Sequence, residues 1–162
     1  MIYITGDKHA DFIDVYYFCY KYKTSIKDTL IVLGDAGINY YCNELDNELK
    51  ESLTEYPITF FCIHGNHEER PENINGYKTK KFHNGIVYYE EKYPNILFAK
   101  DGEIYDFNNK KVLVIGGAYS VDKYYRLQNG YRWYESEQPS NEIKMKILNI
   151  CDKDNNIDVV LS

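Results

Sequence analysis

Three short apolar runs, each closed by a glycine, constrain the fold of this chain more than any other feature. They are residues 2–5 before Gly6, residues 30–33 before Gly34, and residues 58–63 shortly before Gly65. Continuous apolar runs of this length are typical of strands that are covered on both faces. Segments long enough for a helix separate them, and this alternating order favours parallel strands joined by right-handed crossovers. The sequence therefore predicts an α/β layered domain.

Both separating segments have the spacing of an amphipathic helix. In residues 11–23 the positions that share one face are Phe12, Val15, Tyr16 and Cys19. In residues 43–53 the apolar stripe consists of Leu45, Leu49 and Leu53, and Asn43 is a candidate N-cap. Apolar side chains three or four positions apart lie on one side of a helix, so we expect both helices to pack against the sheet.

The second half of the chain has a different pattern. Short β-rich runs separated by turn residues occur at 86–89, 96–99, 103–107 and 111–115. Asn108-Asn109 predicts a tight hairpin between the last two runs. An aromatic and basic segment, 119–134, leads to a helix with Ile143, Ile147 and Ile150 on one face, for which Pro139-Ser140 provides the start signal. Residues 158–161 resemble one more buried strand, and we expect further sequence to follow it.

Length and charge limit the classes of protein to which the chain can belong. Its 162 residues suit one domain, and the net charge of −6 argues against a protein that binds nucleic acid through its phosphate backbone. The local cluster Lys78, Lys80 and Lys81 fits a solvated loop. No long apolar stretch or basic leader is present, so we expect a soluble, cytoplasmic protein without a membrane anchor.

The spacing of the four cysteines also favours a cytosolic protein. Cys19, Cys42, Cys62 and Cys151 are far apart in the sequence, and no two of them form a Cys-x-x-Cys pair. Three of them have the apolar neighbours of small core residues. We therefore expect reduced thiols, as in a cytosolic protein.

Polar side chains follow each of the three predicted parallel strands. Asp7 and His9 follow the first, Asp35 the second, and Asn66 and His67 the third. Ligands of open α/β sheets bind at the carboxyl ends of the strands. Carboxylate, imidazole and amide oxygen together form a ligand set that suits Mn, Fe or Zn.

These residues form blocks that resemble those of the calcineurin-like metallophosphoesterases. The blocks are Gly6-Asp7-Lys8-His9, Gly34-Asp35-Ala36-Gly37 and Gly65-Asn66-His67-Glu68. The turn Gly116-Gly117-Ala118-Tyr119 and the segment through Trp133 extend the likeness over nearly the whole chain, in particular to small bacterial and phage members. The resemblance implies a β-sandwich flanked by helices, a phosphate-ester substrate and two divalent metal ions. Residues 1–162 would then form the N-terminal portion of one such domain, without its last strands.

The resemblance also implies a role for individual residues. Asp7 and His9 would bind one metal ion, Asp35 would bridge both ions, and Asn66 would bind the second. His67 would protonate the leaving oxygen or stabilise the transition state, and two ions about 3.5 to 4 Å apart would hold a hydroxide for in-line attack.

Arg70 resembles an arginine of the protein-phosphatase branch that binds a substrate phosphate with its planar guanidinium. This chain departs from that branch after its second block, where Gly37 is followed by Ile38-Asn39-Tyr40 and not by Asp-Arg-Gly.

A second departure concerns the carboxyl end. Family members carry a histidine after a strand like 158–161 and a later Gly-His-x-His, and this sequence ends before either. The four histidines, His9, His64, His67 and His83, all lie within residues 1–83. The second ion would keep only Asp35 and Asn66, so we expect this chain to be weakly active or inactive.

Simpler interpretations stay open for several residues. Asp7 with His9 alone fits an ordinary turn, and it is the three blocks together that favour a metal site. His64 fits a hydrogen-bonded core residue and His83 an exposed one. Glu68 fits either a residue that positions His67 or the start of a helix or loop. Aromatic packing and the wall of a substrate cleft are both open for a further set, namely Tyr119, Asp122, Arg126 and Trp133.

Three functions remain as hypotheses. The first is a two-metal phosphoric ester hydrolase acting on monoesters or diesters. The second is a non-catalytic fragment or a degenerate module that binds phosphate. The third is a nucleotide-binding α/β domain, which lacks support because the sequence has no Gly-x-Gly-x-x-Gly or Gly-Lys-Ser/Thr run.

Overall fold

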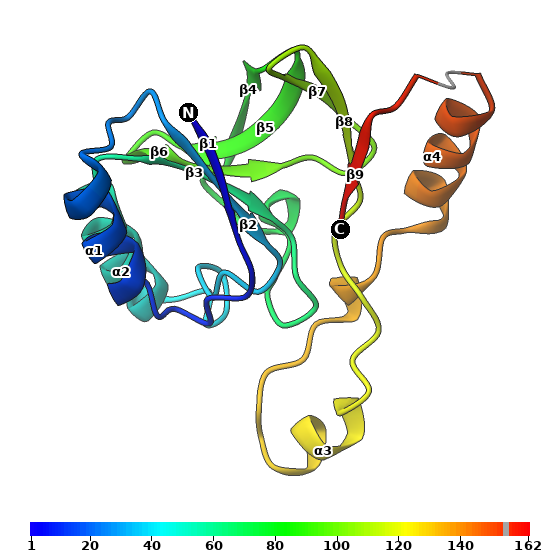
Figure 1. The fold of residues 1–162 in the computed structure, drawn as a ribbon. Helices are drawn as coiled ribbons and strands as arrows, with labels where there is room; N and C mark the ends of the chain where they lie inside the picture. The colour runs from blue at the N-terminus through cyan, green and yellow to red at the C-terminus, as the bar shows by residue number, and fades with distance from the viewer. Residues whose placement is uncertain (154–155) are drawn as a thin grey trace.

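The computed structural model describes residues 1–153 and 156–162, which form two β-sheets and four α-helices (Figure 1). The larger sheet contains β1 (Ile2–Thr5), β2 (Thr29–Leu33), β3 (Thr59–Ile63), β4 (Lys78–Phe82), β5 (Gly85–Glu90) and β6 (Tyr93–Ala99). The smaller sheet contains β7 (Ile104–Phe107), β8 (Lys110–Val114) and β9 (Val159–Leu161). The helices are α1 (Ile13–Tyr22), α2 (Glu44–Thr54), α3 (Lys123–Gln128) and α4 (Asn141–Lys153), with 3-10 turns at Pro71–Asn73 and Glu135–Glu137.

The strand order of the larger sheet is β1-β2-β3-β6-β5-β4. Strands β1, β2, β3 and β6 run parallel, and β5 and β4 add to them in antiparallel fashion. The smaller sheet has the order β7-β8-β9, with β9 parallel to β8. This arrangement confirms the predicted parallel pairing and the β-sandwich flanked by helices.

Successive side chains of the central strands enter two different cores. Val32 and Cys62 face the helices and pack with Phe12 and Leu53. Their neighbours face the smaller sheet, where Ile31, Phe61 and Ile63 pack with Tyr105, Phe107, Val112 and Leu161. Because side chains alternate across a strand, a strand covered on both faces must be apolar at every position. The continuous runs seen in the sequence are therefore explained.

The two crossover helices cover one face of the larger sheet (Figure 1). Asn43 caps α2 as predicted, because its side-chain oxygen accepts a hydrogen bond from Leu45 N at 3.0 Å. The predicted leucine stripe is wrong at one end, since Leu45 is exposed and only Leu53 is fully buried. In α1, Tyr16 is likewise exposed while Val15 and Cys19 are buried. Cysteine burial was also overestimated, because Cys42 and Cys151 are exposed.

Two local features of the antiparallel region test the sequence predictions. Asn108 and Asn109 have φ angles of 55° and 62°, the left-handed values that a two-residue hairpin requires, so the predicted hairpin is confirmed. The predicted loop at Lys78, Lys80 and Lys81 is wrong, because these residues belong to edge strand β4. Exposed lysines are common on edge strands because their charge opposes pairing with another chain.

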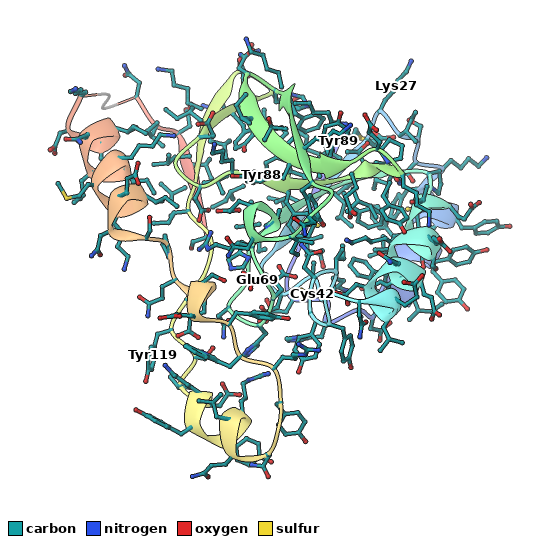
Figure 2. All side chains as sticks on the ribbon, turned by 180° about the vertical axis from the view of Figure 1, so that it is seen from behind. Lys27, Cys42, Glu69, Tyr88, Tyr89 and Tyr119 are labelled. Carbon is teal, nitrogen blue, oxygen red and sulfur yellow. The ribbon has the colours of Figure 1, made fainter. Side chains whose placement is uncertain are left out.

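The segment between β8 and β9 projects from the two sheets. Figures 1 and 2 show the aromatic segment that begins near Tyr119 and contains α3 on one side of the body, and α4 on another. Helix α4 begins as predicted, with the Ser140 hydroxyl accepting a hydrogen bond from Ile143 N at 3.2 Å. Its apolar stripe of Ile143, Ile147 and Ile150 is half-buried. Within residues 1–153 and 156–162, no helix has the length and apolar character needed to cross a membrane.

Candidate metal centre

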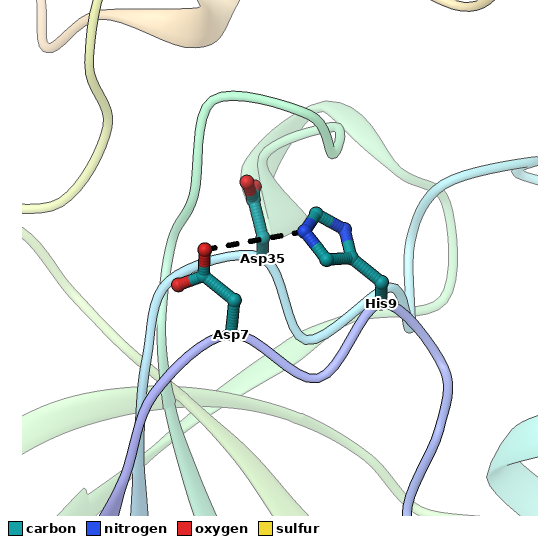
Figure 3. Close-up of side chains that lie close together, drawn as sticks. All are labelled: Asp7, His9 and Asp35. Atoms are coloured by element: carbon teal, nitrogen blue, oxygen red, sulfur yellow. Dashed lines mark ion pairs between the residues drawn. The ribbon is translucent and has the colours of Figure 1, made fainter.

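The loops that follow β1, β2 and β3 meet at one edge of the larger sheet. Because these strands are adjacent and parallel, their carboxyl ends lie side by side. Asp7, His9 and Asp35 point toward one another there (Figure 3), and one ligand atom of each lies within 4.8 Å of the other two. His9 Nε2 lies 3.9 Å from Asp7 Oδ2. The structure thus brings together three of the four predicted metal ligands as a compact cluster.

Backbone hydrogen bonds hold the first two loops in register. The amides of Lys8 and His9 both donate to the carbonyl oxygen of Asp35, at 3.1 and 2.8 Å. His9, Ala10 and Asp35 have φ angles of 45°, 68° and 37°. Left-handed backbone is unfavourable for such residues and persists where surrounding contacts enforce it, which is common at functional sites. The two loops therefore fix the backbone from which two predicted ligands project.

Two glycines allow the loops to approach so closely. A Cβ atom on Gly65 would lie 2.0 Å from Asp35 Oδ1 and 2.1 Å from Asp35 N. A Cβ atom on Gly37, whose φ is +75°, would lie 2.5 Å from Ala10 N. Any larger residue at either position would displace the cluster. Steric exclusion of a side chain therefore explains why the second and third blocks carry glycine at these positions.

Glu68 ties the second loop to the third. Its side chain is fully buried, and its two carboxyl oxygens accept hydrogen bonds from Gly37 N and Gly65 N, each at 3.1 Å. Burial raises the pKa of Glu68 to about 7, against the lowering effect of its backbone donors. The sequence left the role of Glu68 open between orienting His67 and starting an element, and the structure shows that it positions the two glycine loops.

Asn66 and His67 lie beside the cluster. The Asn66 side-chain amide donates to Ser120 Oγ at 2.8 Å, and the same nitrogen lies 3.2 Å from His67 Nε2. His67 N donates to Asp35 Oδ1 at 2.9 Å, and the ring atom His67 Nε2 lies 4.0 Å from Asp35 Oδ2. Burial lowers the pKa of His67, and the nearby Asp35 carboxylate opposes that effect.

Arg70 is not brought to the cluster. Its buried guanidinium donates to Asp101 Oδ2 at 2.6 Å, to the Ser136 carbonyl at 2.7 Å and to the Gly116 carbonyl at 3.3 Å. The predicted phosphate-binding group is therefore engaged with protein atoms in this conformation.

The remaining histidines lie outside the cluster. His64 is buried as predicted, but its ring nitrogens have no hydrogen-bond partner among the described residues, and the Ser136 backbone lies near without reaching hydrogen-bond geometry. Burial and the neighbouring Arg70 charge lower the pKa of His64 to about 3, so its ring is neutral. The Gly116-Gly117 turn lies under this residue, since Gly117 N donates to the His64 carbonyl at 2.7 Å. His83 is exposed, as predicted.

The donor set fits a divalent cation. Two carboxylates and an imidazole offer oxygen and nitrogen atoms to one point, and Asp7 and His9 keep 61% and 60% of their side chains exposed, so an ion can enter from solvent. Mixed oxygen and nitrogen ligands suit Mn, Fe or Zn.

A family model described as calcineurin-like phosphoesterase matches residues 1–162. The chain belongs to the calcineurin-like phosphoesterase family. Membership points to metal-dependent hydrolysis of phosphoric esters, which agrees with the carboxylate and imidazole cluster at the ends of β1 and β2. No curated protein and no solved structure was found to match the chain.

Sequence reasoning missed other residues around this candidate centre. Tyr40 and Tyr41 line a cavity of about 170 Å³ together with His9, Asp35 and His67. Ser120, which is buried, accepts a hydrogen bond from the Asn66 side chain. The tyrosines lie three and four positions after the end of the second block at Gly37, and this short distance in the sequence was the signal available for them. Ser120 lies in a segment without a clear pattern, and only the fold brings it to Asn66.

Proposed function

We propose that residues 1–162 form a single domain that hydrolyses phosphoric monoesters or diesters with two divalent ions, of Mn, Fe or Zn. The observation that carries the proposal is the convergence of Asp7, His9 and Asp35 within 4.8 Å in a chain of this family. Asp7 and His9 would hold one ion, Asp35 would bridge both, and Asn66 would hold the second. When bound, two such ions polarise the phosphoryl oxygens and activate water for attack.

His67 is the proposed proton donor to the leaving oxygen. Hydrolysis forms a bond from a water oxygen to phosphorus and breaks the bond to the leaving oxygen, which departs as an alcohol with one proton. The His67 backbone is fixed by its hydrogen bond to Asp35, and the ring faces the cavity. An imidazole held within reach of the leaving oxygen is well suited to this transfer.

A direct phosphate contact is the role proposed for Arg70, and the structure sets a condition on it. The guanidinium would have to exchange at least one of its partners, Asp101, Ser136 or Gly116, for the phosphate. In the conformation described here Arg70 instead joins three segments of the chain that lie far apart in the sequence.

The second ion is expected to bind more weakly than the first. Only Asp35 and Asn66 are proposed for it, and His64 and His83 lie elsewhere, so full occupancy would require a high metal concentration. We therefore propose low hydrolytic activity for the chain 1–162.

A reducing compartment, such as the cytoplasm, is the proposed location. The four cysteines, all in the described part of the chain, are free thiols. Free thiols persist where the environment is reducing.

The direct test of the function is hydrolysis of p-nitrophenyl phosphate and bis-p-nitrophenyl phosphate in Mn²⁺. We expect slow metal-dependent release of p-nitrophenol, and a loss of at least about 100-fold in metal affinity for Asp35→Asn, because removal even of indirect supports of a metal site costs about 10–100-fold. Asp14→Asn is the matched control, since Asp14 is exposed and pairs with Lys8. Absence of turnover at saturating metal would contradict the proposal and favour a non-catalytic module.

A further inference from the structure

The cavity beside the candidate metal centre is lined by residues of two kinds, polar and aromatic. Its lining includes the polar residues His9, Asp35 and His67 and the aromatic residues Tyr40 and Tyr41. The two rings pack edge to face, with centroids 4.8 Å apart and planes at 89°. Tyr41 lines the cavity and keeps 43% of its surface exposed.

The loop that carries these rings is fixed at several points. The buried Asp46 carboxylate accepts hydrogen bonds from Tyr41 N at 2.9 Å and from Cys42 N at 2.6 Å. From the projecting segment, the Tyr134 hydroxyl donates to the Tyr40 carbonyl at 2.8 Å. A wall that is already ordered binds a ligand without the entropic cost of ordering it.

The size of the cavity limits what the tyrosines can contact. A cavity of about 150 Å³ is enough to hold a benzene molecule, so about 170 Å³ has room for one planar ring. Aromatic side chains bind planar rings by stacking and by edge-to-face contact. The net charge of −6 disfavours a long polyanionic strand and favours a small ester.

We propose that Tyr40 and Tyr41 bind a single planar aromatic ring carried by the leaving group of the ester, as in a pyrimidine nucleoside phosphate or a benzyl-type phosphate. The inference rests on the proposed hydrolase function and names the substrate class of the same site. The chemical step is unchanged: water supplies the oxygen that bonds to phosphorus, and the alcohol that carries the ring leaves with a proton.

The test compares esters that share the same reacting centre. Uridine 5′-monophosphate and ribose 5-phosphate differ in the ring alone, and benzyl phosphate and cyclohexylmethyl phosphate differ in its planarity. With Mn²⁺ present, we expect kcat/KM to be about tenfold higher for the aromatic member of at least one pair, the scale of one stacking contact. A preference in the first pair indicates a nucleoside phosphate, and a preference confined to the second indicates an aryl-bearing ester.

Variants connect the preference to the two rings. Tyr40→Ala and Tyr41→Ala should bring the ratio within each preferred pair close to one, mainly through KM of the aromatic ester. Tyr40→Phe and Tyr41→Phe keep the rings and should keep the ratio. Tyr17→Ala, which removes an exposed tyrosine of α1 away from the cavity, is the matched control and should leave the ratio unchanged. Equal kcat/KM within both pairs, or a preference that survives both alanine variants, would overturn the inference.

Calorimetric binding separates this inference from the proposed function. Uridine 5′-monophosphate and ribose 5-phosphate can be titrated into the Mn²⁺-loaded protein whether or not turnover occurs. Benzyl phosphate and cyclohexylmethyl phosphate are titrated in the same way. Tighter binding of the aromatic member of either pair, lost in Tyr41→Ala, would support the ring site even in an inactive chain. Turnover of all four esters at equal rates would support the hydrolase function and contradict the proposed ring site.

Discussion

Gly65 and Asp35 illustrate how single residues set the geometry of the centre. Asp35 has a left-handed backbone conformation. The Asp35 carboxylate occupies space that a side chain on residue 65 would fill, and Gly65 leaves that space free. Glu68 then satisfies the amide of the half-buried Gly37 and that of the buried Gly65. Unpaired buried amides cost about 1–3 kcal/mol each, so Glu68 stabilises both loops.

Arg70 gives a residue-scale prediction. Arg70→Met leaves the buried Asp101 carboxylate without its charged partner, and loss of one member of a buried ion pair typically costs about 3–5 kcal/mol. We therefore expect the free energy of unfolding, measured with urea, to fall by about that amount.

The control for Arg70→Met is Lys92→Met. Lys92 pairs with Glu51 at the surface, where both side chains are more than half exposed, so little change in unfolding is expected. If Arg70→Met kept full stability while kcat/KM collapsed, Arg70 would be a phosphate-binding residue and not a structural anchor.

At the scale of elements, the centre depends on strands that end together and on helices that hold the sheet. The register Thr5 with Val32, and Leu33 with Ile63, brings the ends of β1, β2 and β3 to one edge. Helix α2 lies between β2 and β3 in the chain, and its buried Asp46 also fixes the loop of Tyr40 and Tyr41. The start of α2 therefore supports both the fold and one wall of the cavity.

Asn43 gives the element-scale prediction. Asn43→Ala removes the side-chain oxygen that caps Leu45 N, and loss of such a cap costs about 0.5–2 kcal/mol. We expect the urea midpoint to fall correspondingly, with no change in the slope of the transition. Glu48→Ala, an exposed position of the same helix, is the control. Equal effects of the two substitutions would show that the cap contributes nothing to stability.

At the scale of the whole molecule, metal binding is expected to stabilise the fold. The three predicted ligands Asp7, His9 and Asp35 come from two loops that only the folded sheet brings together, so we expect an ion to bind the folded state in preference to the unfolded one. Binding energy of this kind adds directly to the free energy of unfolding.

The thermal unfolding midpoint tests this coupling. At a Mn²⁺ concentration about 100 times the dissociation constant, the folded state gains about 2.7 kcal/mol, and for a domain of this size Tm should rise by about 5–10 °C. A chelator should reverse the shift, and Asp35→Asn should abolish it while Asp14→Asn retains it. An unchanged Tm at saturating Mn²⁺ would mean that the cluster does not bind the ion.

The amino-acid sequence alone determined the elements and the ligand types of this protein. Apolar runs predicted β1, β2 and β3, helical spacing predicted α1 and α2, and the residues after each strand predicted Asp7, His9 and Asp35 as neighbours. These properties are local, because periodicity, capping and turn preference act within a few residues. Only the tertiary structure decided that Arg70 pairs with Asp101, that Glu68 joins two glycine loops, and that Tyr40 and Tyr41 line one cavity with the predicted ligands. Such partners are far apart in the chain. Side-chain packing between distant segments selects them, and no local sequence pattern encodes that packing.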